Sequence, residues 1–183
     1  MVAGDGMLRC ARLLTTAFVA TGFGLTACGD GPEAEHNVLV HVESVAVDIH
    51  DAPVLVLEEE EGTRWLPIWI GPAEARSIAL EMEERSSPRP NTHDLARNLI
   101  RGLDAEVTQV VVTELKGGTY FATLTLRVRD RTVEIDSRPS DAVAIALRTR
   151  APIYVRETVF AAAEAAHEDD TDAPGGGEAG REI

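Results

Sequence analysis

Residues 136–147, DSRPSDAVAIAL, place a short polar segment directly in front of an apolar run. The run from Ala142 to Leu147 is apolar on every side of a helix, which predicts a helix that is buried all round. Such a helix must be covered by other elements of the same domain. The segments on either side of it therefore have to supply that cover.

Those segments show mainly the patterns of β-strands. Alternating apolar and polar residues from 38 to 50 predict a half-buried strand. Residues 53–71 hold two apolar runs around an acidic turn with Gly62, which predicts a hairpin with Glu58 to Glu61 in a solvated loop tip. Trp65 and Trp69 are four residues apart and so share one side of its second strand, where they pack the core or a subunit contact. Further strands are predicted at 105–115, 119–128, 131–136 and 152–155.

Two more helices are predicted between these strands. Residues 73–85 carry apolar side chains at helical spacing, and residues 92–103 carry Leu95, Leu99 and Leu103 on one stripe with Thr92 as the N-cap. Hairpins and helices in this order lack the regular alternation of a parallel doubly wound sheet. We expect a single α+β domain with a largely antiparallel mixed sheet and about three helices.

The first residues have the pattern of a bacterial lipoprotein signal peptide. Arg9 and Arg12 precede an apolar run that is too short to span a bilayer, and the run ends in LTAC, with Cys28 as the lipidated residue. Asp5 is unusual in such a signal, so Met7 is the more ordinary start. The alternative is an uncleaved anchor or a chance cysteine. On this interpretation Cys10 is removed with the signal peptide and the thiol of Cys28 carries the lipid. No free cysteine remains, so neither a disulfide nor a thiolate zinc site is expected.

The expected domain organisation follows from composition. Residues 1–27 are the signal peptide, 28–37 a polar tether, 38–160 the folded domain and 161–183 a disordered acidic tail. The formal net charge is -14, with -2 in residues 1–37 and -6 in each of 38–160 and 161–183. An acidic domain argues against a general DNA-coating protein and is compatible with a metal-dependent site. His36 and His167 lie in the tether and the tail and receive no role.

Polar residues outside the core pattern gather in two short segments, PRPNTHD at 88–94 and DSRPSD at 136–141. Each has an Arg-Pro pair, a hydroxyl residue and an aspartate at the start of a helix. Free backbone N–H groups beside an arginine suit an anion such as phosphate. The structural alternative is that Thr92 and Ser140 cap the helices while Arg89 and Arg138 form internal ion pairs. Of the three histidines at 41, 50 and 93, only His93 falls in either segment.

The order of several motifs resembles a known family. LPIWIGPAEARSIALEMEE, RPNTHDLARNLI and IDSRPSDAVAIALRTRAPIYV are similar to the bifunctional nuclease domain of bacteria and plants over about residues 38–160. The resemblance implies a compact α+β domain that self-associates and a nuclease activity on DNA and RNA. It does not supply a residue-by-residue mechanism. The chain departs from the expected pattern in its lipoprotein signal and in its acidic tail, where a UVR-type helical segment is often fused.

Two functions are compatible with these features. The first is a membrane-tethered nuclease at the cell surface or in the periplasm, in which a divalent ion, Mg²⁺ or Mn²⁺, activates water and neutralises phosphate. Its predicted metal ligands are Glu74, Asp94, Asp136 and Asp141; His93 acts as ligand or general base, and Arg89, Arg138, Thr92 and Ser140 bind phosphate. The second is a non-enzymatic oligomeric module that binds an anionic ligand or a protein partner with the same residues.

Overall fold

The computed structural model of the protein describes residues 36–85 and 87–171, and within them seven strands form one sheet. The strand order is β3-β2-β1-β7-β4-β5-β6. The strands are β1 (Asn37–Val47), β2 (Pro53–Glu59), β3 (Trp65–Trp69), β4 (Ala105–Lys116), β5 (Thr119–Val128), β6 (Arg131–Ser137) and β7 (Ile153–Arg156).

The sheet is antiparallel except at one pair. β7 lies between β1 and β4, antiparallel to the former and parallel to the latter. The β4–β5 turn is made by Gly117 and Gly118, which both have positive φ values, 56° and 74°, as a two-residue hairpin turn requires. The predicted hairpins and the largely antiparallel mixed sheet are confirmed.

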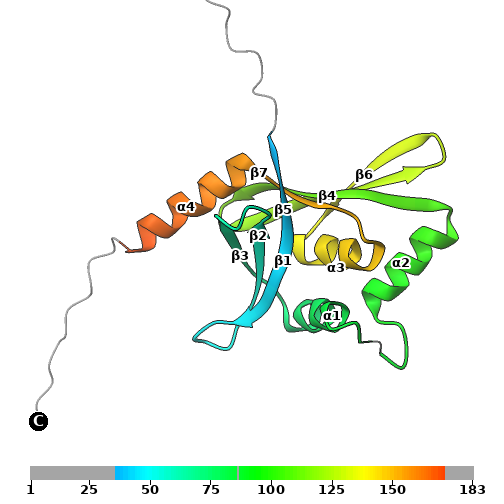
Figure 1. Cartoon of the computed structure of the whole chain (residues 1–183), viewed down its shortest axis with the longest axis horizontal. Helices are drawn as coiled ribbons and strands as arrows, with labels where there is room; N and C mark the ends of the chain where they lie inside the picture. The colour runs from blue at the N-terminus through cyan, green and yellow to red at the C-terminus, as the bar shows by residue number, and fades with distance from the viewer. Residues whose placement is uncertain (1–35, 86, 172–183) are drawn as a thin grey trace, which may run out of the picture. The chain divides into compact units, whose positions relative to one another are not determined.

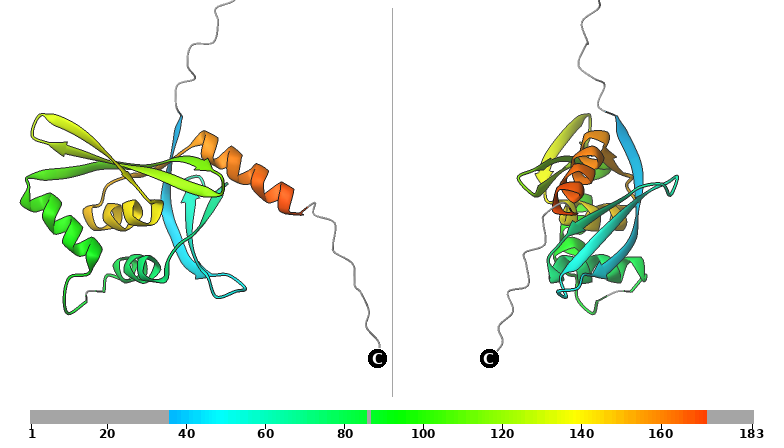
Figure 2. Two further views of the ribbon diagram at one scale, coloured as in Figure 1. Left: turned by 180° about the vertical axis from the view of Figure 1, so that it is seen from behind. Right: turned by 90° about the vertical axis from the view of Figure 1, so that its left-hand side faces the viewer.

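The described residues contain four helices, α1 (Pro72–Met82), α2 (Thr92–Gly102), α3 (Pro139–Thr149) and α4 (Glu157–Thr171). Figures 1 and 2 show α1, α2 and α3 together on one side of the strands. α3 lies at the centre of this layer, because it contacts α1, α2, β4 and β5. Ala142, Val143, Ala144 and Ala146 are completely buried, which confirms the buried helix predicted from DSRPSDAVAIAL.

α2 differs from its prediction in two respects. Its N-cap is Asn91, whose side chain accepts a hydrogen bond from the backbone N–H of Asp94, while Thr92 is the first helical residue. Its leucine stripe faces solvent: Leu95, Leu99 and Leu103 are 54, 58 and 72% exposed. The helix instead turns a polar face inward, on which His93 is buried.

The ends of the domain also differ from the sequence boundaries. Glu58 and Glu59 belong to strand β2 and not to a loop tip. α4 continues to residue 171 with Ala163 buried, although the sequence predicts a disordered tail from residue 161. Alanine has the highest helix propensity, and the alanine-rich run after residue 160 extends the helix.

The remaining terminal predictions lie outside the described residues. They concern the signal peptide, Cys28, most of the tether, and the tail from residue 172 onward. Among the described residues, no helix has the length and apolar character needed to cross a membrane.

Arg64 connects the β2–β3 turn to the start of α4. Its guanidinium donates hydrogen bonds to both carboxylate oxygens of Glu59 at 3.0 Å and to Glu157 at 2.6 Å. The same group lies 4.5 Å above the centre of the Phe160 ring. Hydrogen bonds from Arg64 and then Thr63 lower the pKa of Glu59 from 4.5 to about 2.

The lowered pKa of Glu59 predicts how this contact depends on pH. Because the pKa is lower in the folded chain, the contact stabilises the fold above about pH 4.5 and its contribution is lost as the pH falls toward 2. Arg64→Gln should therefore lower the free energy of unfolding at neutral pH, with a deficit that shrinks on acidification. Urea unfolding at several pH values measures it.

Arg85→Gln is the matched control, because Arg85 forms an exposed ion pair with Glu83. It should have little effect at any pH. If Arg64→Gln lowers the free energy of unfolding by the same amount from neutral to acidic pH, the stabilisation by Arg64 does not come from its pairing with the carboxylates of Glu59 and Glu157.

Candidate functional site

Three helices begin with the same arrangement of charge. Glu74, Asp94 and Asp141 each occupy the third helical position, of α1, α2 and α3 respectively. A carboxylate in the first turn is favoured by the positive end of the helix dipole. The sequence predicts two such corners, and the third, at GPAE, follows the same logic without an arginine.

Arg138 joins two of these carboxylates. Its Nε donates to Asp141 Oδ2 at 2.7 Å, and its Nη2 donates to Asp141 Oδ1 at 3.1 Å and to Glu74 Oε1 at 2.6 Å. Its Nη1 makes no hydrogen bond within the described part of the chain, and the side chain is 63% exposed. Arg138 therefore has N–H groups available to an external anion.

The pKa values of the two carboxyl groups reflect this pairing. The pKa of Glu74 is lowered by a hydrogen bond from its own backbone N–H and by one from Arg138. Burial by itself raises the pKa of Asp141, but the hydrogen bonds from Arg138 and His93 outweigh it and lower the pKa below its ordinary value. Both groups are therefore held as carboxylates.

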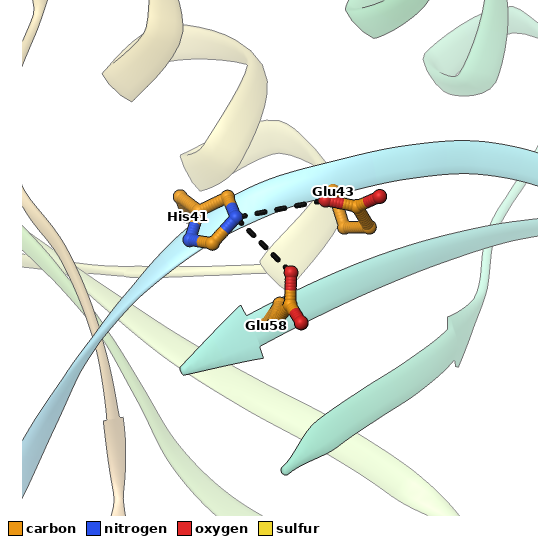
Figure 3. Close-up of side chains that lie close together, drawn as sticks. All are labelled: His41, Glu43 and Glu58. Atoms are coloured by element: carbon orange, nitrogen blue, oxygen red, sulfur yellow. Dashed lines mark ion pairs between the residues drawn. The ribbon is translucent and has the colours of Figure 1, made fainter. Parts of the chain in front are cut away.

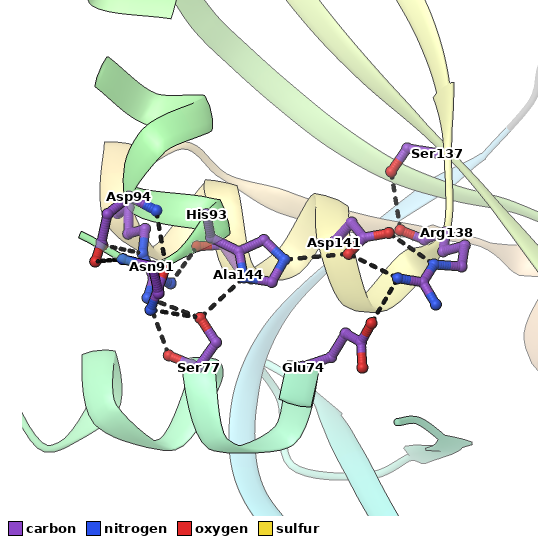
Figure 4. Close-up of polar contacts among 10 residues, drawn as sticks. Glu74, Ser77, Asn91, His93, Asp94, Ser137, Arg138, Asp141 and Ala144 are labelled. Carbon is purple, nitrogen blue, oxygen red and sulfur yellow. Dashed lines mark hydrogen bonds and ion pairs between the residues drawn. The ribbon is translucent and has the colours of Figure 1, made fainter. Parts of the chain in front are cut away.

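His93 brings the two predicted corners together. Its Nε2 lies 3.1 Å from Asp141 Oδ1 and its Nδ1 lies 2.9 Å from Ser77 Oγ. The ring is buried between α1 and α3, as Figure 4 shows. Segments that are about fifty residues apart in the sequence thus form one polar network.

The hydrogen bonds of Ser77 decide the tautomer of His93. Ser77 Oγ accepts one hydrogen bond from Arg148 Nη2 at 2.9 Å and one from Asn91 Nδ2 at 3.1 Å. Both acceptor positions of the hydroxyl are then used, so its single proton points to His93 Nδ1. The proton of the ring is consequently on Nε2, which donates to Asp141.

Arg148 forms the buried end of the network. Only 1% of its side chain is exposed, and it donates to Asp94 Oδ1 at 2.8 Å, to the Ala144 carbonyl at 2.8 Å and to the Ser77 carbonyl at 3.1 Å. Burial raises the pKa of Asp94, but the hydrogen bonds from Arg148 and from the Asn91 backbone N–H outweigh it and leave the pKa lowered. The ion pair is therefore charged on both sides.

Sequence reasoning missed Ser77 and Arg148. Arg148 follows Asp141 by seven residues and Ser77 follows Glu74 by three, so each lies on the same helix face as a predicted residue. A polar residue at helical spacing from a predicted site residue was the available signal.

The structure groups some predicted site residues and separates others. Glu74, His93, Asp94, Arg138 and Asp141 belong to the network. Asp136 does not, because its neighbour Ser137 pairs with the buried Ala122 and side chains alternate along β6, which turns Asp136 to the other face of the sheet.

The remaining predicted phosphate ligands also lie apart from these contacts. Arg89 and Thr92 are exposed, and neither makes a side-chain hydrogen bond or ion pair within residues 36–85 and 87–171. Ser140 is buried at the second position of α3, and the N-cap of that helix is Arg138, without a side-chain cap.

The four predicted metal ligands do not converge. Asp136 faces away from the other three, Asp94 is paired with Arg148, and Arg138 lies between Glu74 and Asp141. In the described part of the chain, the group of three or more potential ligands within 4.8 Å of one another is His41, Glu43 and Glu58. The network thus does not fit a divalent ion in this arrangement.

Two cavities adjoin the network. One of about 280 Å³ is lined by Arg138, Pro139 and Ser140 at the start of α3, by Gly71 at the start of α1, and by the β4–β5 turn. The other, of about 620 Å³, is lined by Arg97, Arg148 and Asp94. The first combines an arginine with two helix N-termini, an arrangement that suits a phosphate group.

Comparison with known proteins identifies the class. A model of the bifunctional nuclease domain matches residues 55–168. An uncharacterized protein of Mycobacterium tuberculosis is 48% identical over 120 residues, which cover 66% of this chain and 71% of the relative. Bifunctional nuclease 2 of Arabidopsis thaliana is 33% identical over 111 residues, covering 59% of this chain and 33% of the plant protein.

Bifunctional nuclease 1 of Oryza sativa subsp. japonica is 27% identical over 109 residues, covering 57% of this chain and 33% of the rice protein. The chain therefore spans about a third of the length of these plant relatives. The protein belongs to the bifunctional nuclease domain family.

Proposed function

We propose that the protein is a nuclease that hydrolyses phosphodiester bonds of DNA, RNA or both. Family membership and the names of the plant relatives support a nuclease. The observation that carries the proposal to particular residues is the exposed Arg138, held by Glu74 and Asp141 beside a cavity at two helix N-termini.

In the proposed site, Arg138 binds the phosphate through its unused Nη1 group. The planar guanidinium presents N–H groups to two phosphate oxygens and stabilises the charge that develops as the bond breaks. Glu74 and Asp141 fix the guanidinium from two sides, so it meets the phosphate in one orientation. His93 positions Asp141 through its Nε2–H group.

A change in pairing would supply the base. While Arg138 holds them, Glu74 and Asp141 have lowered pKa values and are weak bases. A phosphate bound at Nη1 shares the positive charge of Arg138 with the two carboxylates, which weakens their hydrogen bonds to Nε and Nη2 without breaking them and makes the carboxylates more basic. One of these carboxylates then accepts a proton from the attacking water as the water oxygen bonds to phosphorus. The bond from phosphorus to the leaving sugar oxygen breaks, and that oxygen takes the proton from the same carboxyl group.

We also propose that cleavage depends on Mg²⁺ or Mn²⁺. The family resemblance and the acidic charge of the domain support this dependence. Since the predicted ligands lie apart, no step above is assigned to a metal ion. Cleavage assays with EDTA and with each cation restored test this dependence.

A non-catalytic module that binds an anionic ligand is the second candidate. It is favoured by the pairing of Glu74, Asp94 and Asp141 with arginines and by the engagement of both ring nitrogens of His93. A binding module needs the exposed Arg138 and the cavity beside it, but no base.

Cleavage by purified variants separates the two functions. Arg138→Gln and Asp141→Asn should each lower the cleavage rate of labelled DNA or RNA by about a hundredfold or more. The first removes the cation that stabilises charge on the phosphate, and the second removes a carboxylate that orients Arg138 and can accept the proton of water. Exposed residues of the same types give the matched controls Arg131→Gln and Asp130→Asn, which should cleave like wild type.

Circular dichroism checks that the variants are folded. Cleavage that is equal in wild type and both site variants comes from a contaminant and contradicts the nuclease. Asp136→Asn, assayed alongside, tests the prediction for the carboxylate on the other face.

We further propose that the protein is exported and anchored to the cell membrane through lipid on Cys28. The arginines, the short apolar run and the LTAC sequence before the domain support this location. Cells given a fatty-acid analogue should label the wild-type protein and not Cys28→Ala. Labelling of Cys28→Ala would contradict the anchor.

We also propose that the protein self-associates, as the family resemblance implies. The exposed stripe of Leu95, Leu99 and Leu103 on α2 supplies an apolar surface for it. Sedimentation velocity measures the oligomeric state.

A further inference from the structure

A second cluster of potential ligands lies on the outer face of the sheet. His41 Nε2 is 3.3 Å from Glu58 Oε2 and 3.6 Å from Glu43 Oε2, and the three ligand atoms lie within 4.8 Å of one another. Figure 3 shows the three side chains directed to one point above β1 and β2. We propose that this cluster binds a divalent transition-metal ion such as Zn²⁺ or Mn²⁺.

The strand register builds the cluster. His41 and Glu58 are direct partners across β1 and β2, and the next pair, Val42 and Leu57, turns inward to the core. Side chains alternate along strands, so His41 and Glu58 point away from α1 and α3. The register shifts between Val42 and Ser44, and this bulge leaves Glu43 as the extra residue beside His41.

Trp65 orients one of the ligands. Its indole N–H donates to Glu58 Oε1 at 2.9 Å from the adjacent strand β3. The other oxygen, Oε2, is the one that faces His41. A hydrogen bond to the second oxygen of a ligating carboxylate is a common feature of metal sites and fixes the direction of the first.

Charge distinguishes this cluster from the carboxylates that contact Arg64, Arg138 and Arg148. Glu59, Glu74, Asp94, Asp141 and Glu157 are each paired with arginine. Within the described ranges, Glu43 and Glu58 form ion pairs with His41 and with no arginine or lysine. Two carboxylates and an imidazole therefore stand together without a permanent cation.

The ligand types select the class of ion. One imidazole nitrogen with two carboxylate oxygens suits Zn²⁺, Mn²⁺ and neighbouring transition metals, whereas Mg²⁺ and Ca²⁺ prefer oxygen alone. Three protein ligands leave further coordination positions of the ion unfilled. Water can reach these positions, because 51% of the His41 side chain and 53% of the Glu43 side chain are exposed.

This site is independent of the proposed function. It lies on the face of the sheet opposite to Arg138 and His93, and two of its three ligands precede the segment matched by the family model. Binding is measured without nucleic acid, so a nuclease that fails its own test leaves this inference intact.

The indole signals of the two tryptophans give a direct test, because the chain holds only Trp65 and Trp69. The full chain in detergent, labelled with ¹⁵N-tryptophan and carrying Cys10→Ser and Cys28→Ser to remove thiolate ligands, is titrated with Mn²⁺ and with Zn²⁺. Mn²⁺ should broaden the Trp65 indole N–H signal before that of Trp69. Zn²⁺ should shift the Trp65 signal saturably, and Mg²⁺ should not.

His41→Gln should weaken the Zn²⁺ response at Trp65 by at least about tenfold. The matched control is His50→Gln, since His50 is an exposed histidine next to β1 that lies outside the cluster, and this variant should titrate like the parent. A Trp65 signal that ignores both ions, or an equal response in His41→Gln and its parent, would overturn the site.

Discussion

The buried guanidinium of Arg148 is the contact on which the helical layer depends. Arg148 belongs to α3 and donates hydrogen bonds to the carboxylate of Asp94 on α2 and to the carbonyl and hydroxyl oxygens of Ser77 on α1. The side chain of one residue thus connects three helices by hydrogen bonds. An ionic group at this depth is stable only while all its partners are present, since removing one leaves a buried charge without compensation.

This constraint explains the orientation of α2. An amphipathic helix normally buries its leucines, yet α2 exposes Leu95, Leu99 and Leu103 and buries His93. The capping box of Asn91 and Asp94 and the ion pair with Arg148 hold the polar face inward. That orientation places the His93 ring against Asp141, and Asp141 in turn holds Arg138 at the surface. The buried end of the network therefore determines the geometry of its exposed end.

Features that depend on local periodicity were predictable from the sequence, and those that depend on tertiary contacts were not. Strand alternation and the apolar run of α3 follow from local periodicity, so the sheet, its hairpins and the buried helix were predictable. The orientation of α2 was not, because the tertiary ion pair of Asp94 with Arg148 outweighs the leucine pattern. Repeated Arg-Pro segments indicated Arg138, His93 and Asp141, whereas Ser77 and Arg148 lie inside helices that read as ordinary core.

The cluster of His41, Glu43 and Glu58 was missed for a related reason. It depends on strand pairing and on a bulge, neither of which is visible in the spacing of the residues along the chain. On the helix-covered face Glu74, Asp94 and Asp141 pair with arginines. On the outer face Glu106 pairs with Arg127, whereas Glu43 and Glu58 lie beside a histidine.

The free energy of unfolding of four proteins tests the role of Arg148 most directly. Urea titrations of the wild type, Asp94→Ala, Arg148→Met and the double variant give the coupling between the two residues. Asp94→Ala should lower the free energy of unfolding by about 3 kcal/mol or more, because Arg148 stays buried with only the longer contact to Glu81, at 3.8 Å, as a charge partner. The double variant should cost less than the sum of the single changes. A substitution at an exposed residue, such as Asp136→Ala, should change the free energy of unfolding by no more than about 0.5 kcal/mol. A change as small as that in Asp94→Ala would show that the helical layer does not depend on the ion pair of Asp94 with Arg148.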